Sequence, residues 1–244
     1  PGLLVLDVAD PAEPVEIARL LLPRAPSDVW VAADRVYLAY GDAANGLAAD
    51  GPVVGASTVS VIDASRPDAP RDLGLYELDD GEGYQALAFA DGFGLVAGST
   101  GSLRRVDLTE VPGTKVVGTA DPGWYHTEEM VIRDRWLYAL DGYGQLQVLE
   151  LSVDGEPGRL RTFSPGFSAV TLAVGDGRAY LGRKAGGLAV LDTTDPVRPR
   201  VVGTLEADWR SEDLAAEGSV VVAASAHEGL RVVDAAVPTR PVEV

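Results

Sequence analysis

An apolar run that ends in an acidic residue occurs six times in this chain. The acidic residues are Asp7, Asp63, Asp107, Glu150, Asp192 and Asp234. They follow one another at intervals of 56, 44, 43, 42 and 42 residues. A repeat of this length that contains only strand signals is typical of four-stranded blades arranged around an axis. The spacing therefore predicts an all-β fold, a β-propeller of four-stranded blades.

Prolines follow four of the six acidic residues at the fourth and seventh positions. The pairs are Pro11 and Pro14, Pro67 and Pro70, Pro196 and Pro199, and Pro238 and Pro241. Proline has a fixed φ and no N–H, so it suits a turn and not a central strand. We call the six apolar runs the anchor strands. We expect them within residues 3–8, 59–64, 103–108, 146–151, 188–193 and 229–234, with almost no helix in the chain.

A second hairpin, the partner hairpin, precedes each anchor strand except the first. The five copies lie within residues 29–39, 87–97, 130–139, 172–181 and 214–222, and several bend at Asp-Gly or Gly-Ser. The count predicts five complete blades plus half of a sixth, in one propeller domain over residues 1–244 that is truncated at its N-terminus. The long first interval comes from a loop insertion at 41–57, which we interpret as a loop excursion and not as a calcium-binding loop.

The chain is acidic, with a formal net charge of −17 over 244 residues. A field of this sign repels phosphate groups, so nucleic acid is excluded as an expected partner. No apolar run reaches the ~18 residues that a transmembrane helix needs. There is no cysteine, which excludes disulfides and thiolate chemistry.

Two segments repeat the pattern Gly-Leu-x-Val-x-Asp followed by Asp-Pro-x-x-Pro. They run from Gly2 to Pro14 and from Gly187 to Pro199. In this pattern the chain resembles the LVIVD-repeat family of β-propeller proteins. The resemblance implies the propeller fold and a bacterial or archaeal protein exported to the periplasm, the cell surface or the medium. It implies no catalytic residues.

Polar and aromatic residues gather just before the first strand of each partner hairpin. Alignment of the hairpin bends predicts one ring position near the propeller's central channel, formed by Asp28, Gln85, Glu128, Thr171 and Glu212. The loops around this ring carry Tyr84, Trp124, Tyr125, His126, Trp209 and Arg210. Aromatic faces beside convergent polar groups are typical of a binding site. We expect ligand binding at this channel mouth.

Two functions remain open from the sequence. The favoured one is a non-catalytic binding or interaction scaffold of the cell envelope, with a protein, peptide or glycan as its partner. The alternative is a hydrolase or lyase that uses His126 and nearby carboxylates, with or without a metal. No residue is assigned as catalytic, and no cofactor is expected. The carboxylates at the channel mouth leave open a calcium ion there.

Overall fold

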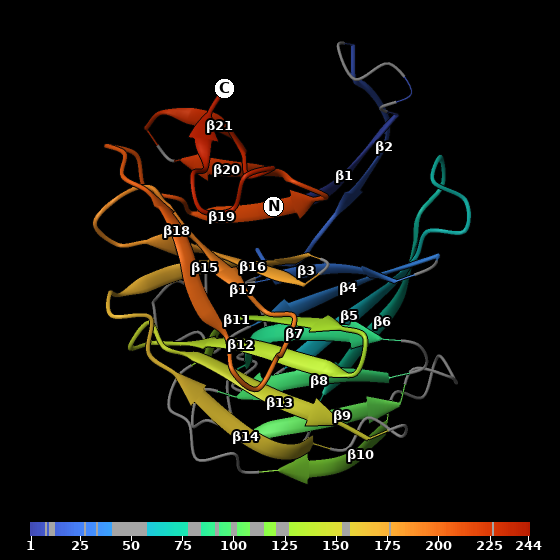
Figure 1. The fold of residues 1–244 in the computed structure, drawn as a ribbon. Coiled ribbons are helices and arrows are strands. Elements are labelled where there is room, and N and C mark those ends of the chain that lie inside the picture. The colour runs from blue at the N-terminus through green and yellow to red at the C-terminus, as the bar shows by residue number, and fades with distance from the viewer. Residues whose placement is uncertain are drawn as a thin grey trace. The chain divides into compact units, whose positions relative to one another are not determined.

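A computed structural model of the chain describes residues 1–7, 9, 13–26, 28–32, 34–40, 58–77, 84–90, 93–98, 102–107, 115–120, 127–152, 157–175, 177–225 and 227–244. The insertion at 41–57 lies outside these ranges. The chain divides into two compact units, Pro1–Thr119 and Ala120–Val244. The strands of both units can be followed by label and colour in Figure 1.

Unit 1 contains a two-stranded sheet and two four-stranded sheets. The two-stranded sheet pairs β1 (Gly2–Asp7) with β2 (Val15–Leu21). The first four-stranded sheet has the order β3 (Asp28–Ala32), β4 (Arg35–Tyr40), β5 (Thr58–Asp63) and β6 (Arg71–Glu77). The second has the order β7 (Tyr84–Ala90), β8 (Phe93–Gly98), β9 (Leu103–Asp107) and β10 (Lys115–Ala120), the last of which ends at the unit boundary.

Unit 2 contains three four-stranded sheets, each in chain order. The first is β11 (Thr127–Arg133), β12 (Trp136–Asp141), β13 (Leu146–Leu151) and β14 (Pro157–Phe163). The second is β15 (Ala169–Gly175), β16 (Arg178–Arg183), β17 (Leu188–Asp192) and β18 (Arg200–Leu205). The third is β19 (Asp213–Glu217), β20 (Val220–Ser225), β21 (Gly229–Asp234) and β22 (Val242–Glu243).

These sheets confirm the predicted fold class. All the strand pairs with a defined register are antiparallel, and none of the described residues is helical. The six anchor strands are β1, β5, β9, β13, β17 and β21, and their bounds agree with the predicted ranges to within one residue. Five four-stranded blades are present together with one two-stranded half-blade. The period of the acidic residues thus located the third strand of every complete blade.

The acidic residue at the end of an anchor strand holds the turn that follows. The carboxylates of Asp7, Asp63, Asp192 and Asp234 each accept a hydrogen bond, at 2.8–3.0 Å, from the backbone N–H two residues later. The turn is closed further on by a backbone bond, such as the one from the Arg198 N–H to the Asp195 carbonyl. A short carboxylate can satisfy a turn N–H in this way, which explains why an acid recurs at the position.

A β-bulge recurs where the anchor strand meets the outermost strand. The register shifts between Val61 and Ile62 in β5 and between Val190 and Leu191 in β17, so Leu73 in β6 and Val202 in β18 are the extra residues. Both extra side chains pack against buried clusters of their own units. The bulge therefore adds an apolar side chain to the packing between sheets.

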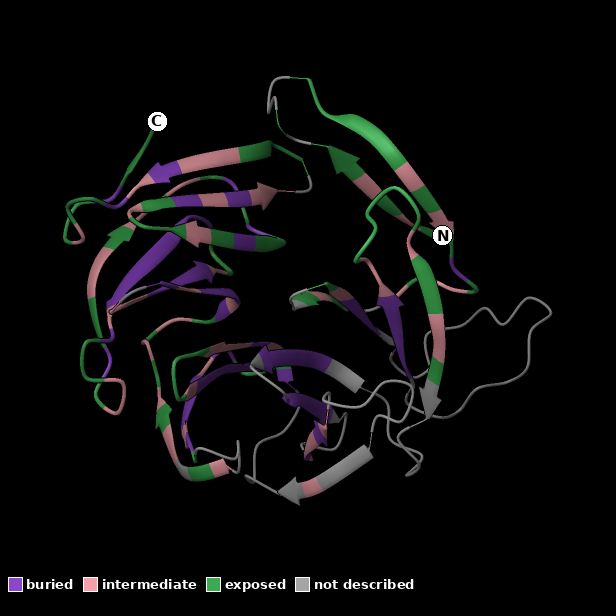
Figure 2. Ribbon diagram, turned by 90° about the vertical axis from the view of Figure 1, so that its right-hand side faces the viewer, coloured by how far each residue is buried: buried purple, intermediate pink, exposed green. Residues whose placement is uncertain are grey.

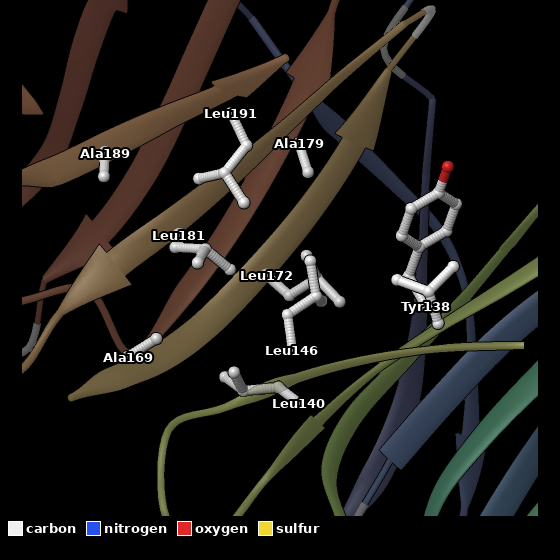
Figure 3. Close-up of a cluster of buried hydrophobic side chains, with 10 residues drawn as sticks. Tyr138, Leu140, Leu146, Ala169, Leu172, Ala179, Leu181, Ala189 and Leu191 are labelled. Carbon is white, nitrogen blue, oxygen red and sulfur yellow. The ribbon is translucent and has the colours of Figure 1, made fainter. Parts of the chain in front are cut away.

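Apolar side chains fill the space between neighbouring sheets of one unit. In unit 2, Tyr138, Leu140, Leu146 and Val148 of the first sheet pack against side chains of the second sheet, among them Leu172. Figure 3 shows Leu146 pointing toward Leu172. Leu146, Val148, Leu172, Leu181 and Leu191 have no exposed surface. Full burial of such a side chain stabilises the fold by about 1.5–3 kcal/mol, so this packing is the main force that joins the two sheets.

The β1–β2 hairpin is covered on one face only. Leu3 and Leu20 pack against a buried cluster of the next sheet that contains Leu38, Tyr40 and Ile62. No residue of β1 or β2 is fully buried, and both strands are green and pink next to the N label in Figure 2. The hairpin thus docks on its neighbour through one face and exposes the other.

Candidate functional site

The first strands of successive sheets lie side by side within each unit. In unit 1, β3 lies beside β7, and in unit 2, β11 lies beside β15 and β15 beside β19. The innermost strands of neighbouring propeller blades have this relationship. The predicted site residues precede or begin these strands, so the structure brings the starts of β11, β15 and β19 into one region of unit 2.

Strand register divides the predicted ring into two positions. Glu129, Thr171 and Asp213 each lie four residues before the end of their strand and pair with Leu140, Gly182 and Ala224, respectively. By the same count, Asp28 shares this position and pairs with Ala39. The other three predicted residues lie one position earlier, five residues before the end of the strand. They are Gln85, Glu128 and Glu212. The five predicted ring residues therefore occupy two adjacent strand positions, and ligand binding at them remains a prediction.

A β-bulge lies at the start of the first strand in three of the sheets. The register shifts between Tyr84 and Ala86 in β7, between Thr127 and Glu129 in β11, and between Ala169 and Thr171 in β15. One extra residue in a strand moves the following side chains to the other face of the sheet. Gln85 and Glu128 are the extra residues at two of these bulges.

Glu129 connects two sheets of unit 2. Its Oε2 accepts a hydrogen bond of 2.6 Å from the backbone N–H of Leu172, which lies in β15. A bond from a backbone N–H to a carboxylate is stronger than one between neutral groups. Glu129 was not among the predicted site residues, although it adjoins Glu128.

Thr171 and Ser211 form a buried hydroxyl pair in the same region. Their oxygens are 2.7 Å apart, and each residue exposes no more than 4% of its surface. Gly182, which pairs with Thr171, faces both hydroxyls at a distance that leaves no room for a Cβ atom. Thr171 therefore joins β15 to the segment that leads into β19.

Trp209 lies inside unit 2. It exposes 4% of its surface, belongs to the buried cluster that includes Leu214 and Val233, and donates from its indole Nε1 to Glu243 Oε2 at 3.0 Å. The aromatic ring thereby packs between the second and third sheets of the unit. Sequence spacing alone gave no sign of the bond to Glu243, which is 34 residues away.

Three predicted site residues are exposed in unit 2, namely Glu128, Arg210 and Glu212. The backbone N–H of Glu212 donates to the Ala224 carbonyl at 2.7 Å, which fixes the main chain just before β19. Glu128 is the second residue of β11 and follows the buried Thr127. These three charged side chains are thus carried on well-defined backbone.

The other predicted site residues are described only in part. Asp28 begins β3, and Tyr84 and Gln85 begin β7, but only their backbone is described. Trp124, Tyr125 and His126 lie outside the described residues. Ligand binding at the channel mouth remains a prediction for all of them.

Arg183 contributes a further charged group at the end of β16. It forms an ion pair with Glu206, and its guanidinium lies 5.4 Å from the centre of the Phe167 ring. The Arg183 side chain is 14% exposed, whereas that of Glu206 is 74% exposed. This group was missed from the sequence because its partners come from two separate loops.

A shallow hollow of about 360 Å³ lies at the turn after β17. Its lining residues are Asp192, Thr194, Asp195, Arg198, Pro199 and Arg200. The hydroxyl and N–H of Thr194, followed by the guanidinium of Arg200, lower the pKa of Asp192 from 3.8 to about 2. These contacts hold the repeated turn, so we interpret the hollow as a by-product of that turn.

Among the residues that the structure describes, no group of three or more His, Cys, Asp or Glu side chains is arranged to hold a metal ion. Nor do those residues form a helix long and apolar enough to span a membrane.

Comparisons with known proteins agree with the strand arrangement. The LVIVD repeat family model matches residues 1–21. A comparison with curated proteins found no match. Among solved structures, a candidate 6-phosphogluconolactonase from Bacteroides uniformis ATCC 8492 is similar over 100% of this chain and 76% of its own, with 13% identity and a TM-score of 0.74.

Two further structures are similar in fold. The WD40 domain of Pan2 from Neurospora crassa matches with 12% identity and a TM-score of 0.63 over 95% of this chain and 69% of its own. The computationally designed Ika4 protein matches with 13% identity and a TM-score of 0.51 over 64% of this chain and 92% of its own. At these identities the likeness concerns the fold alone. The chain is therefore a β-propeller protein that carries an LVIVD repeat at residues 1–21.

Proposed function

We propose that the protein is a non-catalytic binding module that uses the loops before the first strands of its sheets. One observation carries the proposal. In unit 2, the buried polar groups at these strand starts are engaged in bonds between sheets, while Glu128, Arg210 and Glu212 are exposed beside them. Exposed charges on a fixed backbone are typical of a recognition surface.

The proposed partner is a protein, a peptide or a glycan. The net charge of −17 favours a basic or neutral surface over an acidic one. The match to the LVIVD repeat supports export to the cell envelope, because the family that the sequence resembles is commonly exported. This location is part of the proposal.

Screening against an immobilised peptide library and a glycan array tests the function. The variant Glu128→Ala/Arg210→Ala/Glu212→Ala should lose most of the binding found for the unchanged chain. The control Glu13→Ala/Glu217→Ala/Arg240→Ala removes the same side-chain types from exposed positions elsewhere and should retain it. Equal binding by both variants would contradict the proposal.

Calcium at the channel mouth is a separate, testable part of the proposal. A cation that binds the folded chain raises the melting temperature as its concentration rises. Melting curves that do not change in millimolar calcium or magnesium would remove the cation from the account. The hydrolase or lyase alternative depends on His126, which lies outside the described residues, and no observation favours it.

A further inference from the structure

β1 is the anchor strand that differs from the other five in its neighbours. Each of β5, β9, β13, β17 and β21 lies third in a sheet of four and pairs with a strand on both sides. Among the described residues, β1 pairs with β2 alone. Within the described ranges, no strand lies along its second edge to receive its N–H and C=O groups, although the same repeat position is paired on both sides in the other five sheets.

Leu6 shows the effect on side-chain packing. Leu6 is 42% exposed, and Leu4 is 43% exposed. The residues equivalent to Leu6 precede the other acidic anchors, and they are 0–2% exposed. They are Ile62, Val106, Leu149, Leu191 and Val233. The chain itself thus shows that this position belongs in a core.

Register in the complete blades shows what pairs with an anchor strand. The residue opposite the position of Leu6 is Ala179 in one sheet, Leu137 in another and Val36 in a third. Opposite the position of Val5, the same three sheets have Tyr180, Tyr138 and Tyr37, and these rings are 0–3% exposed. In these three sheets the paired strand reads aliphatic, tyrosine, aliphatic, whereas Leu95 and Val222 take the place of the tyrosine in the other two.

We propose that the open edge of β1 is a strand-addition site for an antiparallel β-hairpin of this repeat type. In the added strand an aliphatic residue faces Leu6, a tyrosine faces Val5 and a second aliphatic residue faces Leu4. Main-chain hydrogen bonds to the edge supply affinity, and the alternating side chains supply register. This site does not depend on the binding function proposed for the loops.

Packing and strand pairing fix the position of the β1–β2 hairpin before any strand is added. Leu3 and Leu20 fix one face against the buried cluster of the next sheet, and β2 already pairs with the opposite edge of β1. Leu4 and Leu6 remain on the exposed face. An added strand therefore meets a preformed edge, which lowers the entropy lost on binding.

A peptide that copies residues 127–141, with strands β11 and β12, is the direct probe. In it, Leu137, Tyr138 and Ala139 take the places opposite Leu6, Val5 and Leu4. Fluorescence anisotropy should show saturable binding to the full chain, and hydrogen exchange should show new protection at residues 3–6. The peptide variant Tyr138→Asp and a scrambled peptide should bind at least roughly tenfold more weakly.

Two chain variants provide a matched pair. Leu6→Ala removes the exposed leucine beside the open edge and should weaken peptide binding roughly tenfold. Leu21→Ala removes an 81% exposed leucine from β2, on the far side of β1 from that edge, and should leave binding unchanged. As a second measurement, the same peptide fused before Pro1 through a Gly-Ser linker should raise the melting temperature, whereas the scrambled fusion should not.

Three results would overturn the proposal. The first is the absence of binding together with an unchanged melting temperature of the fusion. The second is equal binding of the scrambled peptide, or new protection at another strand such as β22. The third is self-association of the chain with protection of residues 3–6 before any peptide is added, which would assign the edge to a second copy.

Discussion

The carboxylate Oε2 of Glu129 lies 2.6 Å from the backbone nitrogen of Leu172, in the neighbouring sheet of unit 2. The equivalent residue in the next sheet, Thr171, reaches in turn to Ser211 at 2.7 Å. In these two sheets the same repeat position thus carries a polar side chain that bonds to the next sheet or to the segment leading into it. These bonds orient the starts of the first strands, where the proposed binding surface lies.

Replacement of Glu129 by alanine should destabilise the protein. The change leaves the partly buried N–H of Leu172 without its carboxylate acceptor, which costs about 1–3 kcal/mol of unfolding free energy. Glu129→Gln keeps an acceptor oxygen and should recover most of the loss. Urea denaturation checks this, with Glu217→Ala as an exposed control. An alanine variant as stable as the unchanged chain would show that the bond contributes nothing.

Gly182→Ala should also be destabilising. The new Cβ atom would overlap the hydroxyl oxygens of Ser211 and Thr171, and overpacking of a buried site costs about 1–3 kcal/mol. Gly175→Ala is the matched control, because its Cβ would meet only Tyr180 at 3.9 Å. Equal melting temperatures for the two variants would contradict the close approach at Gly182.

Asp192 predicts a loss of stability in acid. Its pKa is lowered from 3.8 to about 2 by Thr194 and Arg200, so the folded state binds fewer protons than the unfolded chain. The contribution is fully present above about pH 4 and is lost as the pH falls toward about 2. Asp192→Asn keeps the acceptor oxygen for the turn but removes the titration.

Denaturation of the two chains at pH 5 and pH 2.5 measures this effect. The difference in unfolding free energy between the unchanged chain and the variant should shrink as the pH falls. Glu217→Gln, which removes an exposed charge from a site with no turn bond, should not reproduce the change. A constant difference at both pH values would show that Asp192 makes no pH-dependent contribution.

The repeat could be recognised from the sequence because aspartate performs the same physical task after four of the six anchor strands. Asp63, Asp192 and Asp234 each hold the turn after an anchor strand through the same bond to the backbone. The task fixes both the residue and its spacing, so strand positions, strand number and fold class followed from the period. The separate two-stranded sheet of β1 and β2 followed from the hairpin count.

The candidate site could be predicted from the sequence only in part. Glu128 is the extra residue of a bulge and lies one residue further from its bend than Thr171 does, and the sequence pattern did not show this bulge. An aromatic residue in a loop is equally consistent with a binding surface and with the core. Trp209 packs in the core because Glu243, far along the chain, accepts its indole N–H.

Amide hydrogen exchange of the six anchor strands tests the repeat account most directly. β17 pairs with β16 and β18, and its Leu191 has no exposed surface, whereas β1 pairs with β2 alone and its Leu6 is 42% exposed. Exchange protection follows the local free energy of opening. The account predicts strong protection for residues 59–62 and 188–191 and weak protection for residues 3–6. Equal protection of residues 3–6 and 188–191 would contradict it.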